Sequence, residues 1–212
     1  MPFSFLSLVT SMLWNSVKRG TATLLLAHGA GASMDSPFMD YFADELANHK
    51  IRVGRFEFPY MTRRRTEGVK APPNTESILL DSWREQIRGV RAKRLFIGGK
   101  SMGGRMASMI ADECQVTGLV CLGYPFHPPG KPDRLRTEHL IDLQTPALIV
   151  QGERDTFGKR EEVERYDLAS TIEFAWMTDG DHSLKPRKAS GKTLEDNLTD
   201  AVGQIIQFIA SR

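Results

Sequence analysis

Short apolar runs alternate with segments of helical spacing along most of this chain, and this alternation constrains the fold more than any other feature. The apolar runs cover residues 21–29, 51–58, 93–99, 116–124, 145–153 and 171–177. Unbroken apolar runs are typical of parallel strands that are buried on both faces. We therefore predict an α/β fold, with a mostly parallel sheet and helices on both of its faces.

Helical spacing of apolar residues marks the segments between these strands, at residues 36–50, 74–90, 101–113 and 193–212. In the second segment, Leu79, Trp83 and Ile87 recur at a spacing that puts them on one helix face. The length of 212 residues fits one domain with a substantial buried core. We treat 1–212 as a single domain, in which residues 1–20 form either an N-terminal edge strand or an extension.

The charge balance gives no basis for a large charged partner. The formal net charge is only +2, so we expect neither nucleic-acid binding nor attachment to a membrane surface. No apolar run approaches the roughly 20 residues that span a bilayer. The first residues contain no basic side chain before Lys18 and no small-x-small cleavage site, so we expect no signal peptide.

Cysteine usage bears on the compartment. The two cysteines, Cys114 and Cys121, suggest no disulfide framework. We expect both to be small buried hydrophobic residues. This usage fits a reducing compartment, and we predict a cytoplasmic location.

Ligands of α/β sheets bind outside the carboxyl ends of the strands, so the residues directly after each strand are the first candidates for a site. After residues 93–99 comes "GKSMG", which matches G-x-S-x-G with Ser101 at its centre. The match lies between a predicted strand and a predicted helix, where a nucleophile elbow must be. The alternative is a Gly-rich phosphate-binding turn, but the P-loop spacing of glycines is missing. Ser101 is therefore the candidate nucleophile.

A nucleophilic serine needs a base and a group that orients the base. Asp155 follows the strand at 145–153, and His182 lies in the loop before the last helix. Together with Ser101 they give the chain order Ser, Asp, His. Asp179 and Asp181 are rival candidates for the acid, but they stand close to His182 in sequence, where reaching its ring from the sheet edge is difficult.

Stabilisation of an oxyanion requires two backbone N–H groups aimed at the developing charge. We expect one from Met102, directly after the nucleophile. We expect the other from the loop "HGAGAS" after the first strand, with the Ala30 amide first and the Gly31 amide second. His28 of this loop is then a structural residue rather than a base.

Substrate contacts are the least constrained part of the prediction. Tyr60, Arg63, Arg64 and Arg65 follow the strand at 51–58 and would begin at the same sheet edge as Ser101. Such arginines could hold an anionic substrate group; the alternative is a solvated basic loop. His127, in the Pro-rich connection between two late strands, is a further candidate contact. That connection is too short for a separate cap domain, which predicts a small, open pocket for short acyl groups.

The motifs together resemble a known family. "LLLAHGAGASMDSPFM", "RFEFPYM", "IGGKSMGGR", "GYPFHPPGKPDRLRTEHL", "QGERDTFG" and "GDHSL" are similar to the small α/β-hydrolase family of the KANL3/Tex30-like type, which includes many uncharacterised bacterial hydrolases. The resemblance covers about Thr21 to Arg212 and departs before Thr21. It implies an α/β-hydrolase fold without a large lid domain and carries over Ser101, Asp155 and His182 as a catalytic triad. It implies no particular substrate.

These observations predict a serine hydrolase that acts on a small ester, thioester or related acyl substrate, without any metal ion or organic cofactor. Its expected partner is a small-molecule acyl substrate, and the sequence leaves the oligomeric state open. Two alternatives stay open: a non-catalytic protein-interaction module on the same fold, and an acyltransferase. An intact triad favours the hydrolase over the module, because a pure scaffold has no need of all three residues.

Overall fold

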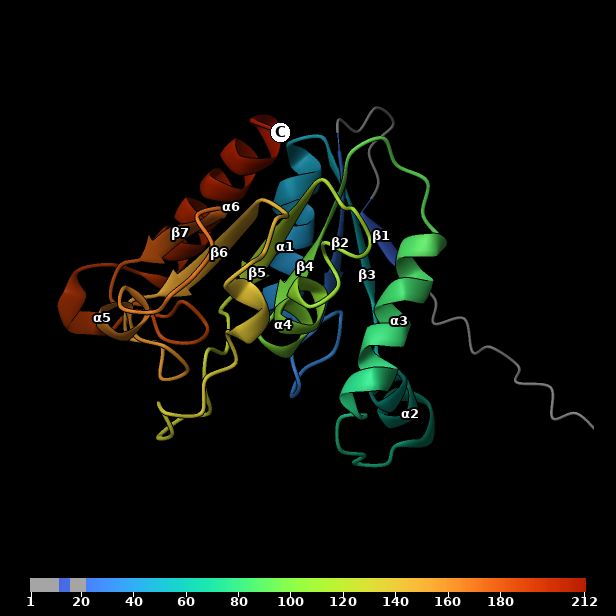
Figure 1. The fold of residues 1–212 in the computed structure, drawn as a ribbon, viewed down its shortest axis with the longest axis horizontal. Coiled ribbons are helices and arrows are strands. Elements are labelled where there is room, and N and C mark those ends of the chain that lie inside the picture. Colours follow the sequence, from blue (N-terminus) through green and yellow to red (C-terminus); the bar gives the residue numbers. More distant parts are fainter. Residues whose placement is uncertain (1–11, 16–21) are drawn as a thin grey trace, which may run out of the picture.

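A computed structural model describes residues 12–15 and 22–212, and in this part of the chain a single seven-stranded sheet forms the centre of the fold (Figure 1). The strand order is β1-β3-β2-β4-β5-β6-β7. All neighbouring strands are parallel except β1, which runs antiparallel to β3. The strands are β1 (Leu13–Asn15), β2 (Ala22–Ala27), β3 (Ile51–Phe56), β4 (Leu95–Lys100), β5 (Gly118–Leu122), β6 (Ala147–Gly152) and β7 (Ile172–Met177).

Helices cover both faces of this sheet, which confirms the predicted fold class. The helices are α1 (Pro37–Asn48), α2 (Pro59–Glu67), α3 (Glu76–Arg88), α4 (Met102–Ser108), α5 (Arg160–Val163) and α6 (Leu194–Ala210). Helices α1 and α6 pack on one face, and α3 and α4 pack on the other. Neighbouring residues of a strand point to opposite faces, so Leu24 and Leu26 lie in the α1/α6 core while Leu25 lies in the α3/α4 core. In Figure 1, α3 flanks the end of the sheet near β1 and α6 the end near β7.

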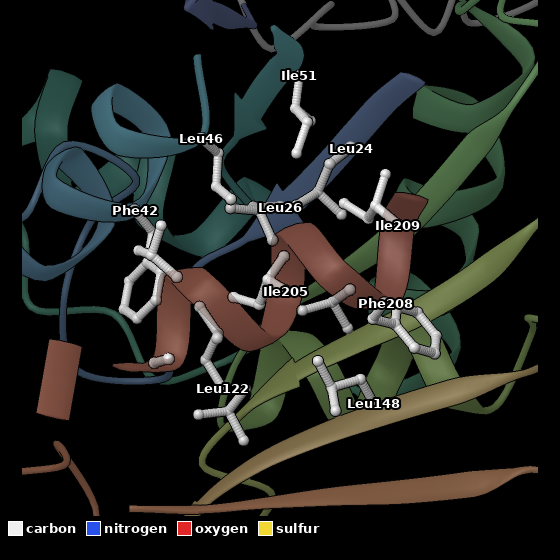
Figure 2. Packing of buried hydrophobic residues seen from close by; sticks show 14 of the residues in the cluster. Leu24, Leu26, Phe42, Leu46, Ile51, Leu122, Leu148, Ile205, Phe208 and Ile209 are labelled. Atoms are coloured by element: carbon white, nitrogen blue, oxygen red, sulfur yellow. The ribbon is translucent and has the colours of Figure 1, made fainter. Parts of the chain in front are cut away.

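The C-terminal helix shows how the sequence places a long element on the sheet. Thr193 and Asp196 form a capping box that satisfies the free amides at the start of α6. Its apolar face, including Ile205 and Phe208, lies against strand residues such as Leu148 (Figure 2). Burying each such side chain contributes roughly 1.5–3 kcal/mol, so α6 is anchored along its length.

Residues Leu13–Asn15 pair with β3 as an antiparallel edge strand. These are the described residues of the segment for which the sequence left an edge strand and an extension as alternatives. The remainder of the predicted N-terminal segment lies outside the described residues. No helix among residues 12–15 and 22–212 has the length and apolarity that a membrane span requires.

Helix α2 was not predicted, because Pro59 looked like the end of a strand rather than the start of a helix. Proline suits the first position of a helix, since its missing N–H has no intrahelical partner there. Gly68 ends α2 in the left-handed conformation and donates its amide to the carbonyl of Arg64. The three consecutive arginines therefore lie on a helix and not on the predicted basic loop.

The connection between β5 and β6 agrees with the prediction that a large lid is missing. Residues 123–146 are all described, and their one regular element is a 3₁₀ turn at Glu138–Leu140. Tyr124, Phe126 and Leu140 of this connection are buried against the main core. The segment thus packs into the α3/α4 core and does not form a cap of its own.

Two glycines offer a matched test of this packing. Gly203 is exposed on α6, and a Cβ there would meet no atom within 4 Å. Gly203→Ala should therefore stabilise the protein by about 0.5–1 kcal/mol through the lower entropy cost of helix formation.

Gly98 lies in β4, where a Cβ would overlap the carbonyl group of Val120. Gly98→Ala should lower the free energy of unfolding by several kcal/mol, on the order of 3 or more, or prevent folding. Urea titrations of both variants measure these effects, and equal stabilities would contradict the packing of β4 against β5.

Candidate active site

Ser101 lies at a sharp turn between β4 and α4, at the carboxyl edge of the sheet. Its φ of 51° and ψ of −115° are outside the regions that residues with a side chain normally occupy. Backbone strain of this kind costs roughly 1–3 kcal/mol and is concentrated at functional sites. The backbone conformation therefore agrees with the predicted nucleophile elbow.

The two glycines of the G-x-S-x-G motif are required by close contact with β2. A Cβ at Gly99 or at Gly103 would overlap the carbonyl oxygen of Ala27. Gly99 also has a φ of 152°, which disfavours any residue with a Cβ. Glycine at both positions lets the turn approach the end of β2 closely and keeps the serine above the sheet edge.

A continuous chain of hydrogen bonds joins the three predicted triad residues. His182 Nε2 lies 2.9 Å from Ser101 Oγ, and His182 Nδ1 lies 2.7 Å from Asp155 Oδ2. An ionised carboxylate only accepts hydrogen bonds, so the proton is on Nδ1, which donates a hydrogen bond to Asp155. Nε2 is then free to accept a hydrogen bond from the serine hydroxyl. This tautomer is the one in which the histidine can act as a base toward Ser101.

Asp155 is fully buried and held on both of its oxygens. Its Oδ1 accepts a hydrogen bond from the Phe157 amide at 2.9 Å, and its Oδ2 accepts one from Gln151 Nε2, also at 2.9 Å. Gln151 in turn bonds the backbone of Tyr124 on the neighbouring connection. Sequence reasoning missed Gln151, although one polar residue inside the apolar run "ALIVQG" was a signal that could have identified it.

The rival acids have other partners. Asp179 pairs with Arg187 and Arg154, and the Arg187 guanidinium lowers the pKa of Asp179 to about 2. Asp181 accepts the backbone amides of Ser183 and Lys185. Both carboxylates therefore shape the loop that carries His182 and do not bond its ring.

The loop after β2 presents the other predicted amides beside Ser101. Gly29 lies close enough that a Cβ there would be 3.6 Å from Cβ of Ser101, and Ala30 lines both cavities that Ser101 lines. Within the described residues, neither the Ala30 amide nor the Met102 amide forms a hydrogen bond. Gly31 lines one of the two cavities. The structure thus places Ala30 and Met102, the two residues whose amides are the preferred candidate oxyanion donors, beside Ser101.

His28 and Tyr60 hold this loop in place. Burial lowers the pKa of His28, so its ring is neutral. His28 Nδ1 donates to the carbonyl of Gly29 at 2.7 Å, and Nε2 accepts the Phe58 amide at 3.1 Å. A trans peptide points its C=O and N–H in opposite directions, so fixing the Gly29 carbonyl also fixes the Ala30 amide. This agrees with the structural role predicted for His28.

The structure places Tyr60, a predicted substrate contact, behind the loop that follows β2. Its side chain is almost fully buried, and its hydroxyl donates to the carbonyls of Ala30 at 3.0 Å and Gly29 at 3.4 Å. Tyr60 lines neither of the two cavities beside Ser101. It therefore supports the loop from behind instead of touching the space next to the nucleophile.

The three consecutive arginines are also used elsewhere. Arg63 pairs with Glu67 on the surface of α2, and Arg64 donates Nε to the carbonyl of Ala71. Arg65 forms ion pairs with two carboxylates, those of Asp35 and Glu57. None of the three arginines lines the two cavities beside Ser101. These placements do not support the predicted anion-binding role, because Arg63 and Arg65 are paired with carboxylates and Arg64 is bound to a backbone carbonyl away from the cavities.

His127 is likewise not brought to the cavities. Its side chain is buried, its Nδ1 bonds the carbonyl of Pro128 at 3.0 Å, and its Nε2 lies 3.5 Å from a carboxylate oxygen of Glu162. The His127 ring therefore faces α5, where its Nε2 has no hydrogen-bond partner among the described residues. Position between two strands does not reveal which side of the connection a residue faces, so the sequence could not place this side chain.

Lys100, directly before the nucleophile, is a residue whose role the sequence left undefined. Its ammonium donates to the backbone carbonyl of His182 and lies 5.0 Å from the centre of the Phe38 ring. Burial lowers the pKa of Lys100 to about 8, against smaller opposite effects of Asp155 and Asp181. Lys100 links the turn at Ser101 to the loop that carries His182, the candidate base, so it is a candidate positioning residue.

Two cavities share Ser101, Ala30 and Phe157 in their walls. One has a volume of about 400 Å³ and lies toward α3 and α4, with Leu79, Arg105, Met106 and Arg136 among its lining. The other has a volume of about 390 Å³ and lies toward α1, with Phe38, Met39, Lys100 and His182 among its lining. Ser101 thus has open space on two sides.

Comparison with known proteins identifies the family of this chain and gives solved structures with the same fold. The chain matches the family described as alpha/beta hydrolase domain over residues 20–210, and it therefore belongs to this family. An alpha-beta serine hydrolase homologue from Coxiella burnetii superposes with a TM-score of 0.70 at 17% identity, covering 92% of this chain and 89% of the other. A serine hydrolase without a lid from Xanthomonas campestris gives 0.68 at 19%, covering 93% and 88%. Est1E from Butyrivibrio proteoclasticus gives 0.65 at 11%, covering 95% and 96%.

The lowered pKa of Lys100 predicts a particular pH dependence. The folded chain releases this proton near pH 8 and the unfolded chain near the ordinary value of 10.5, so unfolding takes up a proton between these values. The free energy of unfolding of the wild type, relative to Lys100→Met, should therefore rise by up to about 3 kcal/mol from pH 8 to pH 10.5. Urea titrations across this range measure it. Lys131→Met, at an exposed site, is the control and should follow the wild type. Parallel curves for wild type and Lys100→Met would contradict the assignment.

Proposed function

We propose that this protein is a serine hydrolase that cleaves a small ester or thioester through a Ser101–His182–Asp155 triad and an acyl-enzyme. The observation that carries the proposal is the unbroken hydrogen-bond chain from Asp155 through His182 to Ser101, which ends at two open cavities. Membership of the alpha/beta hydrolase family supports the same reaction class.

In the first half-reaction, Ser101 Oγ forms a bond to the substrate carbonyl carbon while its proton passes to His182 Nε2. The resulting tetrahedral intermediate then collapses, the bond to the leaving oxygen or sulfur breaks, and the leaving group takes the proton from His182. In the second half-reaction, water attacks the acyl carbon and gives a proton to His182. The bond between the acyl carbon and Ser101 Oγ then breaks, the carboxylic acid leaves, and His182 returns the proton to Ser101. Asp155 stabilises the imidazolium at each stage.

The oxyanion of both tetrahedral intermediates would accept hydrogen bonds from the Ala30 and Met102 amides. Met102 is the first residue of α4, so its amide has no partner within the helix. Preorganised donors of this kind cost no rearrangement when the charge develops, and losing one typically costs on the order of 10²–10³ in rate. The hydrogen bonds that His28 and Tyr60 make to the loop support this preorganisation.

Small substrates fit the site best. The two cavities measure about 400 and 390 Å³, and both are open to solvent. The connection at residues 123–146 supplies a rim without a separate cap. Long acyl chains would extend into water and gain little from burial. We therefore propose short acyl groups as the preferred substrates.

Two finer assignments rest on sequence features. The motifs "GKSMGGR" and "HPPGKP" support placement in the KANL3/Tex30-like branch of the family. The cysteines support a cytoplasmic location, because Cys114 and Cys121 are both unpaired and Cys121 is fully buried. An interaction module without catalytic activity is less favoured, since the intact hydrogen-bond chain has no purpose in a scaffold.

Ser101 should be the residue that an activity-based probe labels. A fluorophosphonate should modify the wild type once, at Ser101, with peptide mapping by mass spectrometry as the measurement. Ser101→Ala should lose both labelling and ester turnover while its far-UV circular dichroism and Tm stay close to wild type. Ser211→Ala, which removes an exposed hydroxyl at the end of α6, is the matched control. Labelling that persists in Ser101→Ala would refute the proposed nucleophile.

Asp155→Asn should distinguish the proposed acid from its neighbours. The amide cannot hold the imidazole tautomer that Ser101 needs, so kcat should fall by several orders of magnitude, about 10⁴ in a well-studied triad. Asp181→Asn should stay within about ten-fold of wild type, because its carboxylate bonds loop amides only. Steady-state kinetics on an acetyl ester measures both variants. The reverse order of activities would show that Asp155 is not the triad acid.

A further inference from the structure

The cavity toward α3 and α4 has a charged wall that the proposed triad chemistry does not use. Its charged lining residues are Arg105, Arg136 and Glu76, and Ser101 lines the same cavity. Two cations therefore face one anion within a space of about 400 Å³ next to the proposed nucleophile. Leu79, Met106 and Pro125 make much of the remaining wall apolar, which strengthens electrostatic interactions inside.

Arg105 is one helical turn after Ser101, and its amide donates to the Ser101 carbonyl at 3.0 Å. Its guanidinium pairs with Glu76 of α3 at 2.9 Å, where the Arg105 side chain is 23% exposed and Glu76 is 50% exposed. The Nε of Arg105 is enclosed and has no hydrogen-bond acceptor among the described residues. One carboxylate, that of Glu76, thus already pairs with this arginine, and its buried Nε stays without an acceptor.

Arg136 has no carboxylate partner in the part of the chain that the structure describes. Its backbone is fixed, because its amide donates to the Phe126 carbonyl at 2.8 Å and its carbonyl accepts the Tyr124 hydroxyl at 3.0 Å. Burial, and then the charge of Arg105, lower the pKa of Arg136, although a guanidinium stays protonated at neutral pH. Two like charges held near each other without a full set of counter-ions favour the binding of an anion between them.

We propose that Arg136, assisted by Arg105, forms a carboxylate-binding subsite in this cavity, so that the preferred substrate is a small ester or thioester with a free carboxylate on one of its two halves. A guanidinium fork matches the planar geometry of a carboxylate and binds it through two parallel hydrogen bonds. The arginine pair therefore takes the role that the sequence suggested for the arginines of α2. The proposed preference for substrates with a free carboxylate rests on the proposed hydrolase function. Binding of a carboxylate at Arg136 can be measured whether or not the protein is a hydrolase.

A binding measurement separates the two proposals. Glutarate should bind to Ser101→Ala, in which no turnover occurs, with isothermal titration calorimetry as the readout and neutral glutaramide as the comparison. Adding Arg136→Gln should weaken glutarate binding by roughly 10- to 100-fold, the usual cost of losing a charged hydrogen-bond partner. Arg134→Gln changes an exposed arginine two positions earlier in the same connection, so it is the matched control and should bind glutarate as Ser101→Ala does.

Turnover tests the same subsite in the otherwise unchanged enzyme. 4-Nitrophenyl hydrogen glutarate and 4-nitrophenyl valerate have acyl chains of equal length, and 3-acetoxybenzoate and phenyl acetate form a second pair with the carboxylate on the leaving group. Within at least one pair the anionic ester should have the higher kcat/KM, after subtraction of the rate with Ser101→Ala. Arg136→Gln should remove this preference, mainly through a higher KM for the anionic ester.

Each outcome decides one proposal. Equal glutarate affinity with and without Arg136→Gln, or wild-type rates that favour the neutral ester in both pairs, would overturn the subsite. Binding of inorganic phosphate without binding of glutarate would also overturn it, because the subsite would then recognise another anion. Arginine-dependent glutarate binding in a wild type that turns over no ester and takes no fluorophosphonate would support the subsite and overturn the hydrolase.

Discussion

The close approach of the elbow to the end of β2 is the constraint on which the site depends. The Ala27 carbonyl oxygen occupies the space that a Cβ at Gly99 or Gly103 would need. This contact holds the strained backbone of Ser101 against the end of β2. The same strand leads directly into the loop that carries the Ala30 amide. One packing contact therefore sets the distance between the candidate nucleophile and one candidate oxyanion donor. Small changes in the β2–β4 packing would move both groups relative to each other.

The other members of the site are linked to this centre from neighbouring strands. Asp155 follows β6, and Gln151 within that strand fixes both the carboxylate and the backbone of Tyr124. His182 follows β7 and is tied back to the elbow by the Lys100 ammonium on its carbonyl. The sheet thus supplies the spacing, while buried polar side chains supply the fine orientation. Such buried networks are stable only when each group has a partner, which explains why a glutamine stands in an otherwise apolar strand.

The sequence predicted the parallel sheet, the elbow and the order of the triad, because each depends on a local pattern followed by a strand end. Helix α2 was missed because proline both ends strands and starts helices, and only the packing of Tyr60 decides between these roles here. The residues predicted as substrate contacts at Arg63–Arg65 and His127 do not line the cavities beside Ser101, for a related reason. Proximity to a strand end indicates an edge of the sheet, but the direction of a side chain and its ion-pair partners depend on residues far away in sequence, such as Asp35 and Glu162.

The carboxylate partners of each arginine therefore indicate better than its exposure whether its charge is available to a ligand. Arg65 has two carboxylates, Asp35 and Glu57, and its charge is fully compensated. Arg105 is paired with one carboxylate, that of Glu76. Arg136 has no carboxylate partner among the described residues. A guanidinium whose donors are satisfied gains little from a ligand, because the ligand would have to replace an existing ion pair of similar strength. Arg136 lines the same cavity as Ser101 and has no carboxylate partner among the described residues, so under the proposed subsite an anionic group gains most by binding there.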